Sequence, residues 1–413
     1  MFVAVLVNKL GTMVGPFLPL YLADVWRLDE AETTRLIAAA SACALLGGPL
    51  GGWLADRYGR RWTLIGAIGL NGLVLSSLPL APSLGVLVGL MLARSLTNDA
   101  IRAPVSAAVA DVVPPESRAR AYGLLRIAIN LGFGLGTFLA GYLATRSFGL
   151  LFAIDGGTAL LAALLLLLLF PETRPARAPT DPARASAAGA EPGPAAGARG
   201  RFALLCACGL LVSLVSMQLT STLPLSLRRR GGEETAALYG TLLALNALVV
   251  VVGQVPLTAL IERLPPGRVL AAGALCYGCG YGAVALSVAP LPLAGAVVLL
   301  TLGEVLFYPL AATVTAELAP PEARGRWFGA LQVAYGVGAV LSPLLGGWVL
   351  SRWGDATLWA CSPPLGLLAA LGLLFLRAPG ERHGERHGER HGAREGEGEG
   401  EGEGEGEGEG EGE

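Results

Sequence analysis

The chain has 413 residues, of which 53% are hydrophobic and only 15% charged, and its mean hydropathy is +0.57. Soluble domains carry about 25% charged residues, so this composition excludes an ordinary water-soluble enzyme or binding domain and indicates a polytopic membrane protein. The formal net charge of −2 says little about the surface, because the C-terminal tail supplies much of the acid, and we expect no nucleic-acid partner.

The N-terminal segment, MFVAVLVNKLGTMVGPFLPLYL, is predicted to form the first membrane helix. It lacks the basic start and the small-residue cleavage site of a secretory signal peptide, and Pro16 and Pro19 interrupt its apolar run.

Apolar segments recur along the chain, each long enough for an α-helix to cross a bilayer, which takes about 20 residues. There are twelve of them: 1–22, 34–55, 62–82, 84–110, 121–145, 149–170, 202–227, 236–261, 268–289, 291–318, 326–350 and 355–376. We therefore predict an all-α membrane protein with twelve transmembrane helices.

The segment GGWLADRYGRRWTL, residues 51–64, concentrates charge between the second and third of these helices. Asp56 and Arg60 are four residues apart, so they can pair on one helical turn. Gly52 and Gly59 would let neighbouring helices approach closely.

The fourth predicted helix carries Arg94, Asn98, Asp99 and Arg102. Arg94, Asn98 and Arg102 recur every four residues, which gives the helix one polar face, and we expect that face to line a water-filled cavity. The alternative is that Asp99 and Arg102 neutralise each other and only hold structure.

Other polar residues in the apolar segments are weaker candidates. Asn130 on the fifth helix is expected to face the cavity, whereas Asp155, near the outer end of the sixth, is expected to reach the membrane interface. Gln218, Asn246 and Gln332 are further cavity candidates.

The segment 171–201 is rich in Pro, Ala and Gly and has no hydrophobic period, so we predict a flexible cytoplasmic linker. It separates an N-terminal six-helix bundle, 1–170, from a C-terminal six-helix bundle, 202–376.

Glu304 lies near the middle of the tenth predicted helix, with no basic residue within a turn on its own helix. Burial in apolar surroundings favours the neutral acid, which suits a carboxylate that gains and loses a proton. The alternative is a structural hydrogen bond.

The tail 377–413 is a low-complexity, acidic, Glu- and Gly-rich segment that we predict to be disordered. It carries all three histidines, His383, His387 and His391, four residues apart. The glycines between them argue against a helix that could hold a metal ion, and we expect no metal site and no cofactor.

An internal repeat relates the two halves at a constant offset of 206 residues. DVVPPESRARAYGLL, which starts at Asp111, aligns with ELAPPEARGRWFGAL, which starts at Glu317, and Asp56-Arg57 aligns with Glu262-Arg263. Two repeated six-helix bundles place a binding site at their interface near the bilayer midplane, as alternating access requires.

The arginines near the helix ends predict the orientation. One side has fourteen of them, and the other has seven: Arg27, Arg35, Arg146, Arg228, Arg229, Arg230 and Arg352. The richer side is predicted to be cytoplasmic, with both termini inside, although the triple Arg228–Arg230 weakens this bias.

The chain resembles the major facilitator superfamily (MFS) of transporters. The superfamily's loop signature, Gly-x-Leu-Ala-Asp-Arg-x-Gly-Arg-(Lys/Arg), is matched by Gly52, Leu54, Ala55, Asp56, Arg57, Gly59, Arg60 and Arg61. The resemblance implies that this loop latches the two halves together on the cytoplasmic side, with Asp111 as a further partner. The alternative for Arg57 and Arg61 is that they only enforce the topology.

The resemblance extends to the helices. Arg94 matches the arginine of the superfamily's fourth-helix motif, although Asn98 replaces its glycine, and a carboxylate at Glu304 is familiar in drug exporters. The antiporter motif of helix five is degenerate here, because Thr137 stands where proline belongs and Ala140 replaces a glycine.

These features predict a secondary active transporter, not an enzyme, that works by alternating access. The resemblance to drug/proton antiporters implies proton-coupled efflux of small amphipathic or hydrophobic compounds by a monomer in the cell inner (plasma) membrane. The alternatives are a transporter of a defined metabolite, such as a sugar, an amino acid or an organic ion, and a non-transporting sensor on the same scaffold.

Overall fold

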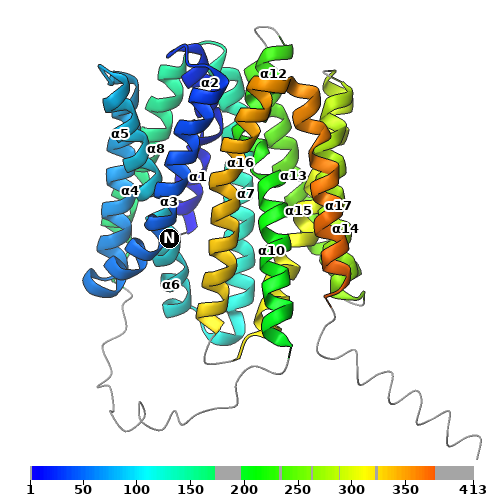
Figure 1. The fold of residues 1–413 in the computed structure, drawn as a ribbon. Coiled ribbons are helices and arrows are strands. Elements are labelled where there is room, and N and C mark those ends of the chain that lie inside the picture. The colour runs from blue at the N-terminus through cyan, green and yellow to red at the C-terminus, as the bar shows by residue number, and fades with distance from the viewer. Residues whose placement is uncertain are drawn as a thin grey trace, which may run out of the picture.

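A computed structural model of the chain describes residues 2–172, 197–231, 235–261, 264–287, 289–320 and 324–376 (Figure 1). Most of the predicted linker, the pair Glu262-Arg263 of the repeat, and the predicted tail lie outside the described residues. Throughout these ranges the chain forms helices and short connections, and no strand occurs in them.

Between residues 2 and 172, the first half forms eight α-helices and one short 3-10 helix. They are α1 (Phe2–Leu10), α2 (Val14–Asp24), α3 (Glu30–Tyr58), α4 (Arg60–Ser77), η1 (Leu78–Leu80), α5 (Leu84–Ala100), α6 (Arg102–Val112), α7 (Pro115–Ala144) and α8 (Phe148–Leu169).

The second half repeats this pattern within its described residues. Its helices are α10 (Ala198–Ser216), α11 (Gln218–Ser221), α12 (Leu223–Arg230), α13 (Thr235–Ile261), α14 (Pro266–Ala283), η2 (Val284–Leu286), α15 (Pro290–Leu318), α16 (Arg324–Ala360) and α17 (Ser362–Leu374).

The all-α, twelve-span organisation predicted from the sequence is confirmed. In the described part of the chain, ten helices are long and apolar enough to cross a membrane. The first predicted span is built from two shorter helices, α1 and α2. The twelfth is built from the end of α16, beyond the kink at Gly354 (φ 81°), together with α17.

The first helix of each half is broken at the same place in the repeat. α1 ends at Leu10 and α10 ends at Ser216, 206 residues later. In the first half, Gly11 and Pro16 flank the break, and both residue types weaken a helix, because glycine is flexible and proline lacks an N–H donor.

In the second half, Gln218 fills the corresponding break. Its Nε2 donates to the Ser342 carbonyl oxygen (3.3 Å), and its Oε1 accepts a hydrogen bond from Thr222. The Gln218 side chain is therefore buried as part of the fold, whereas the sequence placed it in a cavity.

The two halves meet through two helix pairs, α7 with α13 and α3 with α16, which stand side by side in Figure 1. Close packing in both pairs needs glycine: a Cβ at Gly141 would lie 2.6 Å from the Ala236 carbonyl oxygen, and a Cβ at Gly347 would collide with Thr34. The offset of 206 residues carries Gly141 onto Gly347 and Thr34 onto Gly240, so the repeat seen in the sequence also relates these two contacts.

Apolar side chains also cover the outside of the helices, as expected of a protein solvated by lipid. On α8, for example, Leu168 and Leu169 are 69% and 76% exposed. Inside, the aromatic rings of Phe17 and Tyr239 meet edge-to-face across the two halves, with their centroids 5.2 Å apart.

Candidate functional site

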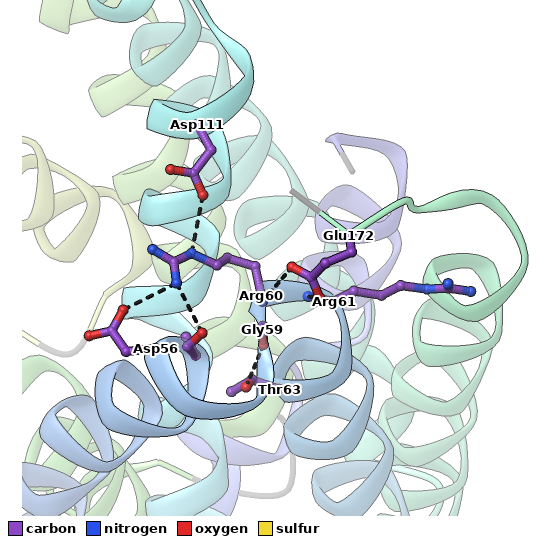
Figure 2. Close-up of polar contacts among 8 residues, drawn as sticks. Asp56, Gly59, Arg60, Arg61, Thr63, Asp111 and Glu172 are labelled. Atoms are coloured by element: carbon purple, nitrogen blue, oxygen red, sulfur yellow. Dashed lines mark hydrogen bonds and ion pairs between the residues drawn. The ribbon is translucent and has the colours of Figure 1, made fainter. Parts of the chain in front are cut away.

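Arg60 is the centre of the charged cluster between α3 and α4. Its guanidinium pairs with Asp56 Oδ1 (3.1 Å) and with Asp111 Oδ2 (3.1 Å), and it donates a third bond to the Ala55 carbonyl oxygen (3.0 Å) (Figure 2). The Asp56 side chain is largely exposed, whereas the side chains of Arg60 and Asp111 are each only 14% exposed. Arg60 therefore ties α3, α4 and α6 to one another at the predicted cytoplasmic end.

Glu172, just beyond α8, completes this cluster and was missed in the sequence. Its two carboxylate oxygens accept hydrogen bonds from the backbone N–H groups of Arg60 (2.9 Å) and Arg61 (3.3 Å), at the N-terminus of α4 (Figure 2). A carboxylate stabilises a helix N-terminus because it satisfies free N–H donors and opposes the helix dipole. No local pattern predicts this contact, since more than a hundred residues separate its partners.

The glycines of the loop act differently from the sequence prediction. Gly59 adopts φ 95°, a backbone conformation that side chains rarely allow, and a Cβ there would collide with the Glu172 carboxylate. Gly52 is not a point of close approach, because a Cβ there would meet only Ala103 at an ordinary 3.8 Å. The close approach of α3 to α5 is instead at Gly51, where a Cβ would collide with backbone atoms of Ala100.

Arg57 and Arg61 make contacts other than the pairs of Arg60. The Arg57 guanidinium lies over the rings of Trp53 and Tyr58, 5.5 and 5.6 Å from their centroids. Arg61 donates to the Leu167 carbonyl oxygen (2.7 Å), and Figure 2 shows its side chain extended away from Asp56. The contacts described here all lie within the first half, so a latch between the halves stays a prediction.

The polar stripe of the fourth span divides into two parts. The span breaks at Ile101 between α5 and α6, and across this break Arg102 pairs with Asp99 (3.0 Å). Asn98 and Arg94 lie one and two turns earlier on α5, respectively, and both are half-buried. The Arg94 Nε atom is buried and has no hydrogen-bond partner among the described residues.

Asp155 does not reach the membrane interface, so that expectation was wrong. Its side chain on α8 is 4% exposed, and its Oδ2 accepts hydrogen bonds from the backbone N–H groups of Met13 (3.2 Å) and Val14 (3.0 Å). These are the free donors at the N-terminus of α2, where the first span is broken. Asp155 thus stabilises the break, because a buried N–H group without a partner would destabilise the fold.

Lys9, the single lysine of the chain, was also missed as a candidate. It lies near the end of α1, half-buried, and packs against Gly132 of α7. Two signals could have identified it: a lysine inside an apolar span, and the glycine and prolines that follow it and weaken the helix.

Glu304 lies on α15 beside polar groups of α13. Asn246 Nδ2 donates to Glu304 Oε2 (3.1 Å) and to the Thr301 hydroxyl (2.9 Å), and Asn246 itself is buried. The structure therefore brings Asn246, a weak cavity candidate from the sequence, next to Glu304, the candidate for proton coupling. Asn130 is half-buried on α7, and Gln332 is exposed.

Three tyrosines, Tyr277, Tyr281 and Tyr308, lie near Glu304. Tyr277 stacks on Tyr281 and meets Tyr308 edge-to-face, with centroids 6.4 and 6.3 Å apart. The Tyr308 hydroxyl bonds to the Ser216 hydroxyl (2.9 Å), next to the break between α10 and α11.

The arginines Arg228, Arg229 and Arg230 at the end of α12, the outer arginine cluster, all have carboxylate partners. Two of the pairs cross between the halves: Arg228 with Asp24 of α2, and Arg229 with Glu30 of α3 (3.4 Å). The third, Arg230 with Asp355 (3.5 Å), stays within the second half. The cluster that weakened the charge bias therefore ties the halves together at the predicted outer end.

A sequence profile of the Major Facilitator Superfamily matches residues 1–234 and 205–399. The chain belongs to this superfamily. The repeated halves and the charged cluster around Arg60 are thus parts of a multi-pass membrane transporter.

One relative and one solved structure match nearly the full chain, and a second relative matches part of it. Uncharacterized MFS-type transporter YqjV of Bacillus subtilis (strain 168) is 25% identical over 378 residues, which cover 89% of this chain and 91% of that protein. Quinolone resistance protein NorA of Staphylococcus aureus is 30% identical over 165 residues, 39% of this chain and 42% of NorA. The crystal structure of a POT family transporter in complex with 5-aminolevulinic acid has a TM-score of 0.76 at 14% identity and covers 91% of this chain and 95% of that one.

Proposed function

We propose that this MFS transporter exports small amphipathic or hydrophobic compounds across the plasma membrane by alternating access, driven by protons. The observation that carries the proposal is Glu304, a carboxylate inside the second bundle with a hydrogen-bonding amide from a facing helix. The resemblance to drug exporters and the partial likeness to NorA support export of such compounds.

Glu304 has the surroundings that a proton-coupling group needs. Asn246 donates a hydrogen bond to its carboxylate (3.1 Å), and the buried rings of Tyr277 and Tyr281 on α14 lie nearby. A carboxylate can take up and release a proton when its access to water changes. Alternating access provides such a change in each cycle.

Alternating access is supported by where the halves are held together. The outer arginine cluster joins them at one end, while the contacts of Arg60 at the other end stay within the first half. We propose that this arrangement is the inward-facing state, and that breaking the outer pairs accompanies the opposite state.

The test is gradient-driven transport in proteoliposomes, with fluorescent amphipathic dyes as substrates. Glu304→Gln keeps the shape of the side chain but cannot release a proton, so dye binding should survive while transport driven by a pH gradient disappears. Glu317→Gln, an exposed acid on the same helix, is the matched control and should transport normally. If Glu304→Gln keeps the wild-type rate and pH dependence, Glu304 is structural and the proton-coupling role is wrong.

A further inference from the structure

We propose that Lys9 and Arg94 form a binding site for an acidic group of the substrate, at the break between α1 and α2. The substrates would then be amphipathic compounds that carry a carboxylate or a similar anion. This inference rests on the proposed transport function and names the substrate class of its site.

The geometry around the break brings three spans together. Arg94 reaches from α5 to the first turn of α2, where a Cβ at Gly15 would lie only 2.9 Å from its Nη2 atom. Lys9 comes from α1, on the other side of the break, and Asp155 comes from α8. Each of these three groups lies close enough to the other two to interact electrostatically.

The charges in this cluster do not balance. Asp99 and Arg102 neutralise each other (3.0 Å), which leaves Lys9 and Arg94 with Asp155 as the nearby acid, an excess of one positive charge. Asp155 is already engaged by two backbone N–H groups, and it makes no ion pair with either cation. Among the described residues, neither Lys9 nor Arg94 has a hydrogen-bond or ion-pair partner, and Arg94 Nε is buried.

Such an arrangement is unfavourable on its own. An unpaired charge removed from water destabilises a protein, and inside a membrane span it marks a functional site by default. The positive end of the α2 dipole adds to the field of the two cations. An anion that enters beside Arg94 and Lys9 supplies the missing partner, and a carboxylate matches the forked donors of the arginine.

The test uses matched pairs of probes: 1-pyrenebutyric acid, 1-naphthylacetic acid and dansylglycine, each with its primary carboxamide. Binding is measured by thermal stabilisation of the purified wild-type protein at pH 7.5, with chloride and inorganic phosphate as separate arms. We expect acids to bind about tenfold more tightly than their amides, the size expected of one charge-assisted hydrogen bond. In Lys9→Met and Arg94→Gln the ratio of the affinity for each acid to the affinity for its amide should fall toward one.

Two further variants control for folding. Lys9→Arg and Arg94→Lys keep the positive charge and should keep the preference for acids, whereas Arg146→Gln removes an exposed arginine elsewhere and should leave the ratio as in the wild type. Equal binding of acids and amides by the wild type, or an acid preference that survives in both Lys9→Met and Arg94→Gln, would overturn the site.

The remaining outcomes separate the site from the transport function. If chloride or phosphate stabilises the protein as strongly as the acids and competes with them, the site belongs to an inorganic ion, and the inference is wrong. If uncharged or cationic dyes are transported and acids are not bound, the inference fails while the transport function stands. If acids are bound at Lys9 and Arg94 but no probe is transported, the site stands and the transport function fails.

Discussion

Removing the carboxylates that pair with the outer arginine cluster should open the predicted outer end of the protein. The double variant Asp24→Asn, Glu30→Gln leaves the arginines in place, so Arg229 can still donate to the Leu350 carbonyl oxygen (2.6 Å). It breaks only the two ion pairs that join the halves. The conformational equilibrium should shift toward the state in which the halves separate at this end.

The magnitude follows from the exposure of these pairs. The side chains of Arg228 and Asp24 are 35% and 42% exposed, and those of Arg229 and Glu30 are 34% and 22% exposed, so solvent screens both pairs. Partly exposed ion pairs contribute about 0.5–1 kcal/mol each, so the two together contribute about 1–2 kcal/mol. The ratio of outward-open to inward-open molecules should therefore rise about 5- to 30-fold.

The assay is pulsed electron paramagnetic resonance with spin labels at Ser147→Cys and Ser351→Cys, both exposed, in a background without the six native cysteines. The matched control is Asp355→Asn, which breaks the pair with Arg230 (3.5 Å) but leaves both halves joined. Opening of this end should lengthen the distance between the two labels. The population with the longer label-to-label distance should therefore rise in the double variant and stay as in the wild type in the control. An unchanged distribution in the double variant, or equal opening in Asp355→Asn, would refute the reasoning.

Three further predictions concern other parts of the molecule. Gly59→Ala should lower the stability by about 1–3 kcal/mol, because the φ of 95° at Gly59 suits only glycine, whereas Gly52→Ala should be tolerated. Thermal unfolding in detergent measures both effects. Equal effects would contradict the different roles given to these two glycines. Asp155→Leu leaves the N–H groups of Met13 and Val14 without a partner and should lower the stability by about 2–3 kcal/mol, whereas Asp155→Asn, which can still accept a hydrogen bond, should lower it less. The same unfolding measurement checks both variants. If Asp155→Leu is as stable as the wild type, Asp155 does not stabilise the N-terminus of α2. Truncation after Arg377 should leave dye transport near normal at equal membrane abundance, since the tail composition cannot build a core, and a large loss would show that the tail takes part in transport.

The sequence alone determined the class of the protein, its twelve spans and its repeat. These features are local or periodic: an apolar run of about 20 residues is long enough to span a bilayer whatever surrounds it. The pair Asp56–Arg60 was predictable for the same reason, because residues four apart on a helix are neighbours. The likeness of Asp111 to its superfamily counterpart predicted the third member of that cluster.

Only the tertiary structure decided the contacts between distant segments. The sequence predicted that Asp155 reaches the membrane interface. The sequence of its own helix does not indicate that the free N–H groups of Met13 and Val14, which Asp155 accepts bonds from, lie beside it. The glycine assignments failed at Gly52 for the same reason: whether a Cβ fits depends on the neighbouring helix.

The triple Arg228–Arg230 is the clearest case. In the sequence it weakens the positive-inside pattern, and nothing near it marks Asp24 and Glu30, about 200 residues earlier, as partners. Folding brings these charges together at the end of the bundle, since the repeated halves pack side by side along α3 and α16 and along α7 and α13. Hydropathy and helical period record which segments cross the membrane, but the pairing of charges depends on distances in space, which only the packed helices define.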